Sequence, residues 1–124
     1  MKSTLKTIKH FKEWVEKELE IEKPAKVQLH KSRKSLKTYA DYSPGEGVVR
    51  TYISERSLGD CLRSIAHELV HHKQNEEGRI KSSYDIELED EANAIAGRLI
   101  RKYANTHPES NVYDTVIKHG KNNK

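Results

Sequence analysis

The chain has 124 residues, of which 34% are hydrophobic and 34% are charged, and its formal net charge is +4. Because a typical domain is about 45–50% apolar, these values indicate one polar domain with a small core, which we place at residues 1–120, with a basic tail at 121–124. No apolar run reaches the roughly 18–20 residues that span a bilayer, and the N-terminus lacks the apolar segment of a secretory signal. The single cysteine, Cys61, excludes an internal disulfide, so we expect a cytoplasmic protein.

In chain order, the apolar pattern first predicts an amphipathic helix over residues 4–21 and then three strands. The segment 25–31 alternates between polar and apolar residues, which is typical of a half-buried strand. The segments 36–42 and 48–54 flank the turn sequence SPGEG, and this arrangement predicts a β-hairpin.

Three further helices are predicted after the strands, over residues 58–77, over residues 86–104, and in a short segment that begins at Pro108. The resulting order is α-β-β-β-α-α-α. It predicts an α+β fold in which a small, three-stranded antiparallel sheet packs against the helices.

Charge is distributed unevenly along the chain. The net charge is +6 over residues 1–40, −5 over 41–100 and +3 over 101–124. The basic ends could contact nucleic acid, but no nucleic-acid-binding motif accompanies them, so a solvated lysine-rich surface is favoured.

Two histidines four residues apart lie in the middle of the second predicted helix, in the sequence His67-Glu68-Leu69-Val70-His71. Residues at this spacing share one helix face, so both imidazoles can bind the same metal ion. Glu68 can then reach a water molecule activated by the metal and take its proton as the water attacks a carbonyl. The alternative is that both histidines lie on an exposed polar face. Since unsatisfied polar groups in a core helix are costly, a metal site is favoured.

A catalytic zinc site needs a third protein ligand and leaves its fourth position to water. We expect this ligand in the acidic run that begins the helix predicted over 86–104, where a helical hairpin can return beside the histidines, and Glu91 is the leading candidate. Glu87, one turn earlier, is the alternative ligand or a hydrogen-bond partner of a ligand. Asp85, Asp90 or a histidine remain open as ligands, and these acids could instead stabilise the helix N-terminus.

The pairing of HELVH with the later segment DEANAIA resembles the gluzincin metallopeptidases, and among them the small ImmA/IrrE-type zinc peptidases. The resemblance covers roughly residues 39–104. Its matching residues are His67, Glu68, His71, Glu91, Ala92, Asn93, Ile95 and Ala96. It implies a zincin-like domain with one Zn²⁺ per chain, bound by His67, His71 and Glu91, and with Glu68 as the general base and acid.

The resemblance also implies a sheet edge beside the active-site helix, to which a substrate peptide adds as an extra strand. Val48–Ser54 is our candidate for this edge. Tyr84, Tyr103 and His107 are candidate hydrogen-bond donors to the oxyanion of a tetrahedral intermediate. His72, which directly follows the motif, is expected on the surface.

We therefore expect a zinc-dependent metallopeptidase that acts on a peptide or protein substrate, with no membrane association. Its short length is similar to that of the minimal peptidase domains that phage and mobile elements encode. The alternative is a catalytically inactive, zinc-bound module that binds a partner through its sheet edge or its basic N-terminal helix. Glu68 favours the enzyme, because a purely structural zinc site has no use for that carboxylate and prefers four protein ligands.

Overall fold

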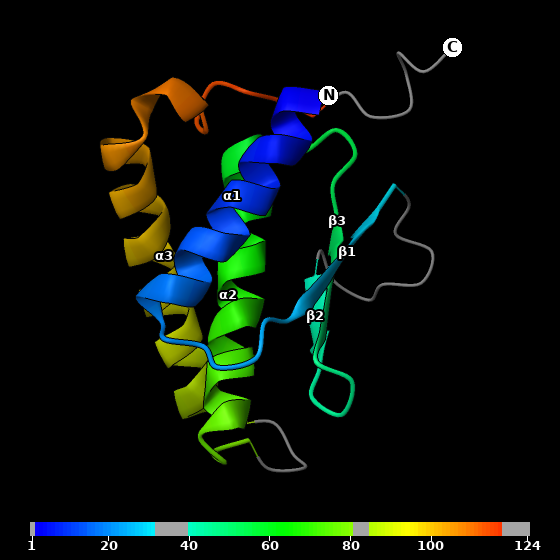
Figure 1. Ribbon diagram of the computed structural model, residues 1–124, viewed down its shortest axis with the longest axis vertical. Helices are drawn as coiled ribbons and strands as arrows, with labels where there is room; N and C mark the ends of the chain where they lie inside the picture. Colours follow the sequence, from blue (N-terminus) through cyan, green and yellow to red (C-terminus); the bar gives the residue numbers. More distant parts are fainter. Residues whose placement is uncertain (1, 32–39, 81–84, 118–124) are drawn as a thin grey trace.

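The computed structural model describes residues 2–31, 40–80 and 85–117, which form helices and one small sheet (Figure 1). In chain order the elements are α1 (Lys2–Glu18), β1 (Lys26–His30), β2 (Ala40–Ser43), β3 (Val48–Tyr52), α2 (Leu58–Glu76), α3 (Ile86–Thr106) and the 3-10 helix η1 (Pro108–Ser110). The expected α+β class is therefore confirmed, whereas the tail predicted at 121–124 lies outside the described residues. No helix in the described segments is long and apolar enough to cross a membrane.

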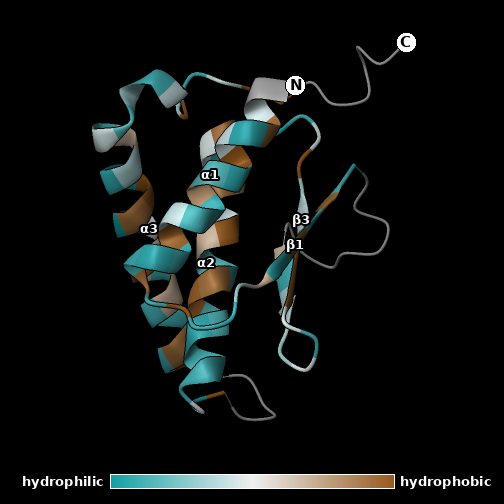
Figure 2. Ribbon diagram, viewed as in Figure 1, coloured by the Kyte–Doolittle hydropathy of each residue, from teal (hydrophilic) through white to brown (hydrophobic). Residues whose placement is uncertain are grey.

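Helix α2 is the central element, with α1 and α3 packed against it and the sheet on its other side (Figure 1). Each helix carries both hydrophobic and hydrophilic residues along its length, as expected for helices with one buried face (Figure 2). The side chains of Phe11 in α1 and of Leu62, Ile65 and Leu69 in α2 are fully buried in the shared core. Because its apolar side is covered by all three neighbours, α2 holds its remaining polar side chains in a fixed orientation.

The sheet is mixed, and the prediction of an antiparallel sheet is wrong in this respect. Strand β3 lies in the centre, antiparallel to β2 and parallel to β1, with Lys26 opposite Val48. The hairpin of β2 and β3 is confirmed, and Gly47 in its turn has a φ of +65°, a conformation that glycine adopts without strain. The pairing of β1 is non-local, and alternation along a strand does not indicate which partner it takes.

The short fourth helix is reduced to the single turn η1, which is a second correction. Asn111 follows with a φ of +52°, and the chain then runs beside the beginning of α2. There the Leu58 N–H donates to the Thr115 carbonyl and the Gly59 N–H to the Val112 carbonyl. The apolar residues of this segment therefore cover the N-terminal end of α2 without forming a helix.

Candidate metal centre

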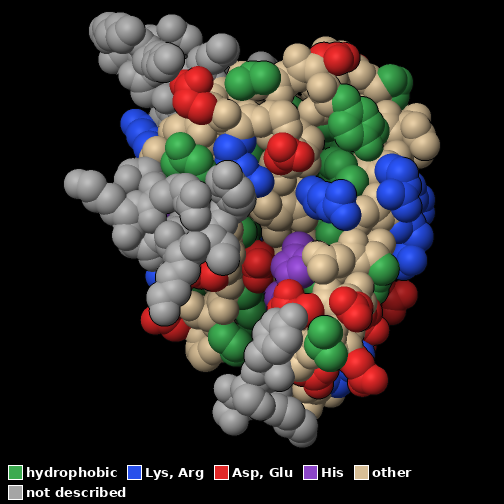
Figure 3. Space-filling view, turned by 180° about the vertical axis from the view of Figure 1, so that it is seen from behind, with side chains coloured by type: hydrophobic (Ala, Val, Ile, Leu, Met, Phe, Trp, Pro, Cys, Tyr) green, Lys and Arg blue, Asp and Glu red, His purple; other side chains and the backbone are tan. Residues whose placement is uncertain are grey.

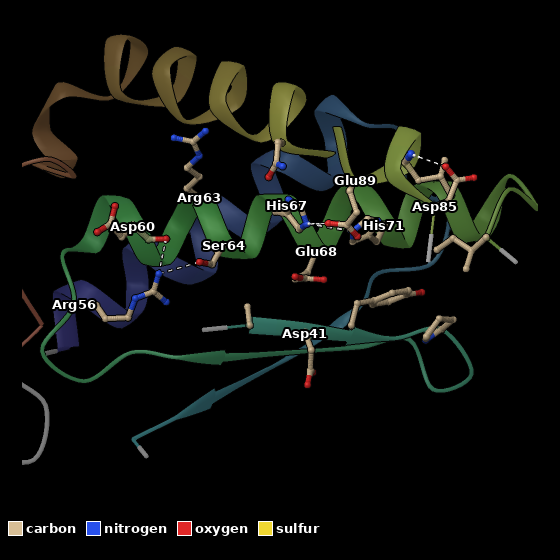
Figure 4. Close-up of a pocket in the computed structure, with 16 residues that line it drawn as sticks. Asp41, Arg56, Asp60, Arg63, Ser64, His67, Glu68, His71, Asp85 and Glu89 are labelled. Carbon is tan, nitrogen blue, oxygen red and sulfur yellow. Dashed lines mark hydrogen bonds and ion pairs between the residues drawn. The ribbon is translucent and has the colours of Figure 1, made fainter. Parts of the chain in front are cut away.

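Helix α2 presents the HELVH motif to a cleft between β2 and the beginning of α3 (Figure 4). Ser57 caps the helix by accepting a hydrogen bond from the Asp60 N–H, which fixes where the helix begins. Ile65, Ala66 and Leu69 are fully buried. The helix is thereby held so that the two histidines of the motif and Glu68 line the cleft, which has a volume of about 750 Å³.

The two motif histidines meet at their Nε2 atoms, which lie 3.2 Å apart. One Glu89 oxygen lies 3.1 Å from the His67 Nε2, and the other lies 2.9 Å from the His71 Nε2. One ligand atom from each of His67, Glu68 and His71 lies within 4.8 Å of the other two, so this group can hold a metal ion. The space-filling view shows histidine at the bottom of a hollow in this face (Figure 3).

The hydrogen bonds behind His71 prepare its Nε2 to bind a cation. Its Nδ1 lies 2.8 Å from the Gln74 Oε1, and the Gln74 amide nitrogen donates to the Leu88 carbonyl and to Glu91. With its nitrogen fixed by two acceptors, Gln74 turns its oxygen to His71, so the His71 proton is assigned to Nδ1. The Nε2 lone pair then points at the Nε2 of His67 and at the Glu89 carboxylate. This donor set fits a cation.

The charges of the site also fit a cation. Burial and the neighbouring His71 lower the pKa of His67, despite opposing contributions from Glu89 and Asn93, so the neutral imidazole that a metal requires is favoured. The Glu68 side chain is only 8% exposed, and burial, with the nearby acids Glu89 and Asp41, raises its pKa to about 8. A carboxyl group with a pKa in this range is suited both to accept and to donate a proton near neutral pH.

The structure does not bring Glu91 to the histidines. The Glu91 carboxylate accepts a hydrogen bond from Gln74 at 2.7 Å and pairs with Arg79, and these contacts lower the pKa of Glu91. Glu89 lies in the position beside the histidines that was expected for Glu91. The physical reason is helical phase, because two residues along an α-helix correspond to a rotation of about 200°.

Asp85, Glu87 and Asp90 form no ion pair with the two histidines. Glu87 and Asp90 are exposed and do not line the cleft. Asp85 is the N-cap of α3 and accepts hydrogen bonds from the Glu87 and Leu88 N–H groups, although it also lines the cleft. The alternative of ordinary helix capping is therefore confirmed for Asp85.

Two of the candidate oxyanion donors, Tyr103 and His107, do not line this cleft. Tyr103 is buried in an aromatic cluster with Phe11 and Trp14, and its hydroxyl lies 2.8 Å from the His10 Nδ1. His107 stacks on Tyr103 with the ring centroids 4.3 Å apart. Tyr84 lies outside the described residues.

The candidate edge strand is also corrected. Val48–Ser54 contains β3, which pairs on both sides, whereas β2 borders the cleft through Ala40, Asp41 and Tyr42. The sequence contained a signal for Glu89 that the prediction missed. Glu89 precedes the buried Ala92 by three residues and so shares its side of α3, whereas Glu91 lies about 200° away from Glu89 and reaches α2 near its C-terminal end, at Gln74.

Comparisons with protein-family models, with curated proteins and with solved structures find no match to this chain. The function of this chain is therefore inferred from the geometry of its site.

Proposed function

We propose that this protein is a zinc-dependent metallopeptidase in which His67, His71 and Glu89 bind the zinc ion and Glu68 is the general base and acid. The observation that carries the proposal is the convergence of two imidazole nitrogens and one carboxylate on a single point of an open cleft. Two imidazoles and a carboxylate suit zinc better than magnesium or calcium, which prefer oxygen ligands alone. Three protein ligands leave one position open, as in catalytic zinc sites.

In this mechanism the metal, when bound, lowers the pKa of a water molecule and polarises the carbonyl of the scissile peptide bond. Glu68 takes the proton of the attacking water and passes it to the nitrogen of the leaving amine. Among the described residues none hydrogen-bonds the Glu68 carboxylate, and its raised pKa favours uptake of the proton from water in the first step.

The edge of β2 is the surface on which a substrate peptide can be held. In the described part of the sheet, β2 is an outer strand that pairs with β3, and Asp41 and Tyr42 line the cleft opposite α2. An extended peptide that adds to this edge places its backbone between β2 and the two histidines.

The test begins with elemental analysis of protein purified without chelators or metal-affinity steps. We expect about one zinc ion per chain and its loss in His67→Ala. Digestion of an unstructured protein such as casein is then followed by mass spectrometry. Glu68→Gln should keep the zinc and lower the cleavage rate by at least about 100-fold, since a general base contributes about 10²–10⁴-fold.

Two results would contradict the proposal. Absence of zinc, with none taken up on addition, removes the metal site. Zinc binding with tight retention of peptides that are never cut instead indicates the zinc-bound interaction module.

A further inference from the structure

The cleft carries different charges at its two ends. Arg56 and Arg63, with the acid Asp60, line it toward the N-terminal end of α2, whereas Asp85 and Glu89 line it toward the C-terminal end. In the space-filling view, basic side chains lie above the histidines and most of the acidic side chains of this face gather below them (Figure 3). A peptide bound along the cleft therefore meets opposite charges on the two sides of the metal centre.

Arg63 and Arg101 approach each other beside the basic end of the cleft. Measured from the position that a Cβ on Gly97 would take, the Arg63 Nη2 and the Arg101 Nη1 each lie 3.5 Å away. Arg63 lines both the cleft and a second, smaller cavity of about 230 Å³ next to it, whereas Arg101 lines only the second cavity. Two guanidinium groups that approach the same point repel each other. An anion that binds between or beside them relieves this repulsion.

Among the described residues, no acid forms an ion pair with Arg63 or Arg101. No hydrogen bond within the described segments joins either arginine to a carboxylate, although Asp60 lines both cavities. Arg56 adds a fixed positive charge nearby, since it donates to the Tyr52 and Asp60 carbonyls and to the Ser64 hydroxyl. Figure 4 shows Arg56 and Arg63 at the same end of the cleft, on either side of α2.

The direction of the sheet edge indicates which part of a substrate reaches these arginines. Asn75, near the end of α2, donates to the Pro44 carbonyl just after β2, so β2 and α2 run in the same direction. A peptide that pairs with β2 in the commoner antiparallel sense runs the opposite way. Its residues after the scissile bond then lie toward Arg63.

The distance from the metal centre limits which of these residues can reach Arg63. Arg63 precedes His67 by one helical turn, which is about 6 Å along the axis. An extended peptide advances about 3.3 Å per residue, so this separation corresponds to about two residues.

We propose that Arg63, together with Arg101, binds a carboxylate of the substrate within the first two residues after the scissile bond. The peptidase therefore prefers Asp or Glu there, or a chain that ends there with its free carboxylate. This inference rests on the proposed peptidase function.

The first test maps cleavage sites in a mixture of unstructured peptides of equal length by mass spectrometry. We expect the wild-type protein to enrich Asp and Glu about five- to tenfold at the first two positions after the cut. Arg63→Gln removes the enrichment, and Arg63→Glu replaces it with a preference for Lys and Arg. Arg98→Gln is the matched control, because Arg98 is an exposed arginine of α3 that lines neither cavity, and it keeps the wild-type preference. Cleavage without acidic enrichment, or enrichment that survives Arg63→Gln, overturns the inference and leaves the peptidase in place.

A binding measurement separates failure of the inference from failure of the proposed function. Zinc-loaded Glu68→Gln protein is titrated into three labelled peptides: one with an internal glutamate and an amidated end, a neutral one with a free carboxyl end, and a neutral amidated one. The inference requires that one of the first two peptides binds at least fivefold more tightly than the neutral amidated peptide. This difference should disappear when Arg63→Gln is added. The peptide that binds more tightly identifies whether the carboxylate comes from a side chain or from the chain end. Equal binding of all three overturns the inference even where cleavage occurs. If the wild-type protein cuts no peptide, the proposed peptidase function is rejected. The difference in peptide affinity then tests on its own whether Arg63 binds a carboxylate.

Discussion

His71 and His72 are adjacent in α2 but lie in opposite kinds of environment. His72 is 6% exposed, and the protein satisfies both of its ring nitrogens: the Tyr42 hydroxyl lies 2.7 Å from Nδ1, and the Lys23 carbonyl lies 2.6 Å from Nε2. His71 has one satisfied nitrogen, Nδ1, whereas its Nε2 faces the Nε2 of His67 and the Glu89 carboxylate. The first histidine joins parts of the fold, and the second is arranged to share a cation.

The comparison shows how one helix can use the same side chain in two ways. A rotation of about 100° per residue turns His71 toward the cleft and His72 toward β2 and the segment before β1. The expectation that His72 lies on the surface is therefore wrong, because the sheet covers that side of α2. Burial of a histidine alone does not indicate a ligand, whereas a ring nitrogen that meets only other metal-binding groups does.

Replacing each of the two histidines with alanine should separate their roles, and this is the largest expected effect. His71→Ala should lower zinc affinity by more than about 100-fold, since removing even an outer hydrogen-bond partner of a ligand costs about 10–100-fold. His72→Ala should keep zinc affinity within about tenfold and destabilise the fold by about 1–3 kcal/mol, because it leaves buried polar groups unpaired. Competition with a chelating dye and urea unfolding of the metal-free protein measure the two quantities. The comparison fails if His72→Ala loses zinc as completely as His71→Ala.

A second pair of variants distinguishes the two acids of α3. Glu89→Gln should lower zinc affinity by at least about 100-fold, because it removes a charged ligand while keeping the shape of the side chain. Glu91→Gln should change it by less than about tenfold, since an amide oxygen can still accept the hydrogen bond from Gln74. If Glu91→Gln proved the more damaging change in the dye competition, the ligand set proposed here would be wrong.

These two acids also show how far the sequence could predict the site. The i, i+4 spacing of His67 and His71 depends only on helix geometry, so local sequence was sufficient to pair them. The position of the third carboxylate depends on how α3 packs against α2, where Ala92 and Ala96 are buried, and this packing is a non-local property. The same limit explains the sheet, where the local hairpin was predicted and the non-local parallel pairing of β1 was not.

The third prediction concerns the side chain behind His71. Gln74→Met keeps the approximate volume of this fully buried residue but removes the acceptor of the His71 Nδ1 proton. We expect zinc affinity to fall by about 10–100-fold, the usual effect of losing such a partner. Asn75→Met is the matched control on the His72 side, because Asn75 bonds Tyr42 and Pro44 and does not contact the metal centre. Equal losses in both variants would mean that Gln74 acts only through the stability of the helix.

The smallest expected effect is a pH dependence on the His72 side. Burial raises the pKa of Glu76. Hydrogen bonds from the Lys23 and Glu22 N–H groups, together with the nearby His72, lower it by a larger amount, so the pKa lies below its usual value. A carboxylate with a lowered pKa stabilises the fold above its unfolded-state pKa of about 4.3, and this stabilisation is lost as the pH falls through the lower folded-state pKa.

Glu76→Gln should therefore cost about 1 kcal/mol at pH 7 in urea unfolding of the metal-free protein, and the difference from wild type should shrink steadily below about pH 4. Glu77→Gln is the control, because Glu77 forms an exposed ion pair with Arg79, a kind of contact that contributes little. A cost that stayed constant down to pH 3 would mean that the charge of Glu76 is not what matters. Because Glu76 holds the segment before β1 against α2, zinc affinity at pH 7 should stay unchanged in Glu76→Gln. Stability would then change on one side of the helix without a change in metal binding on the other.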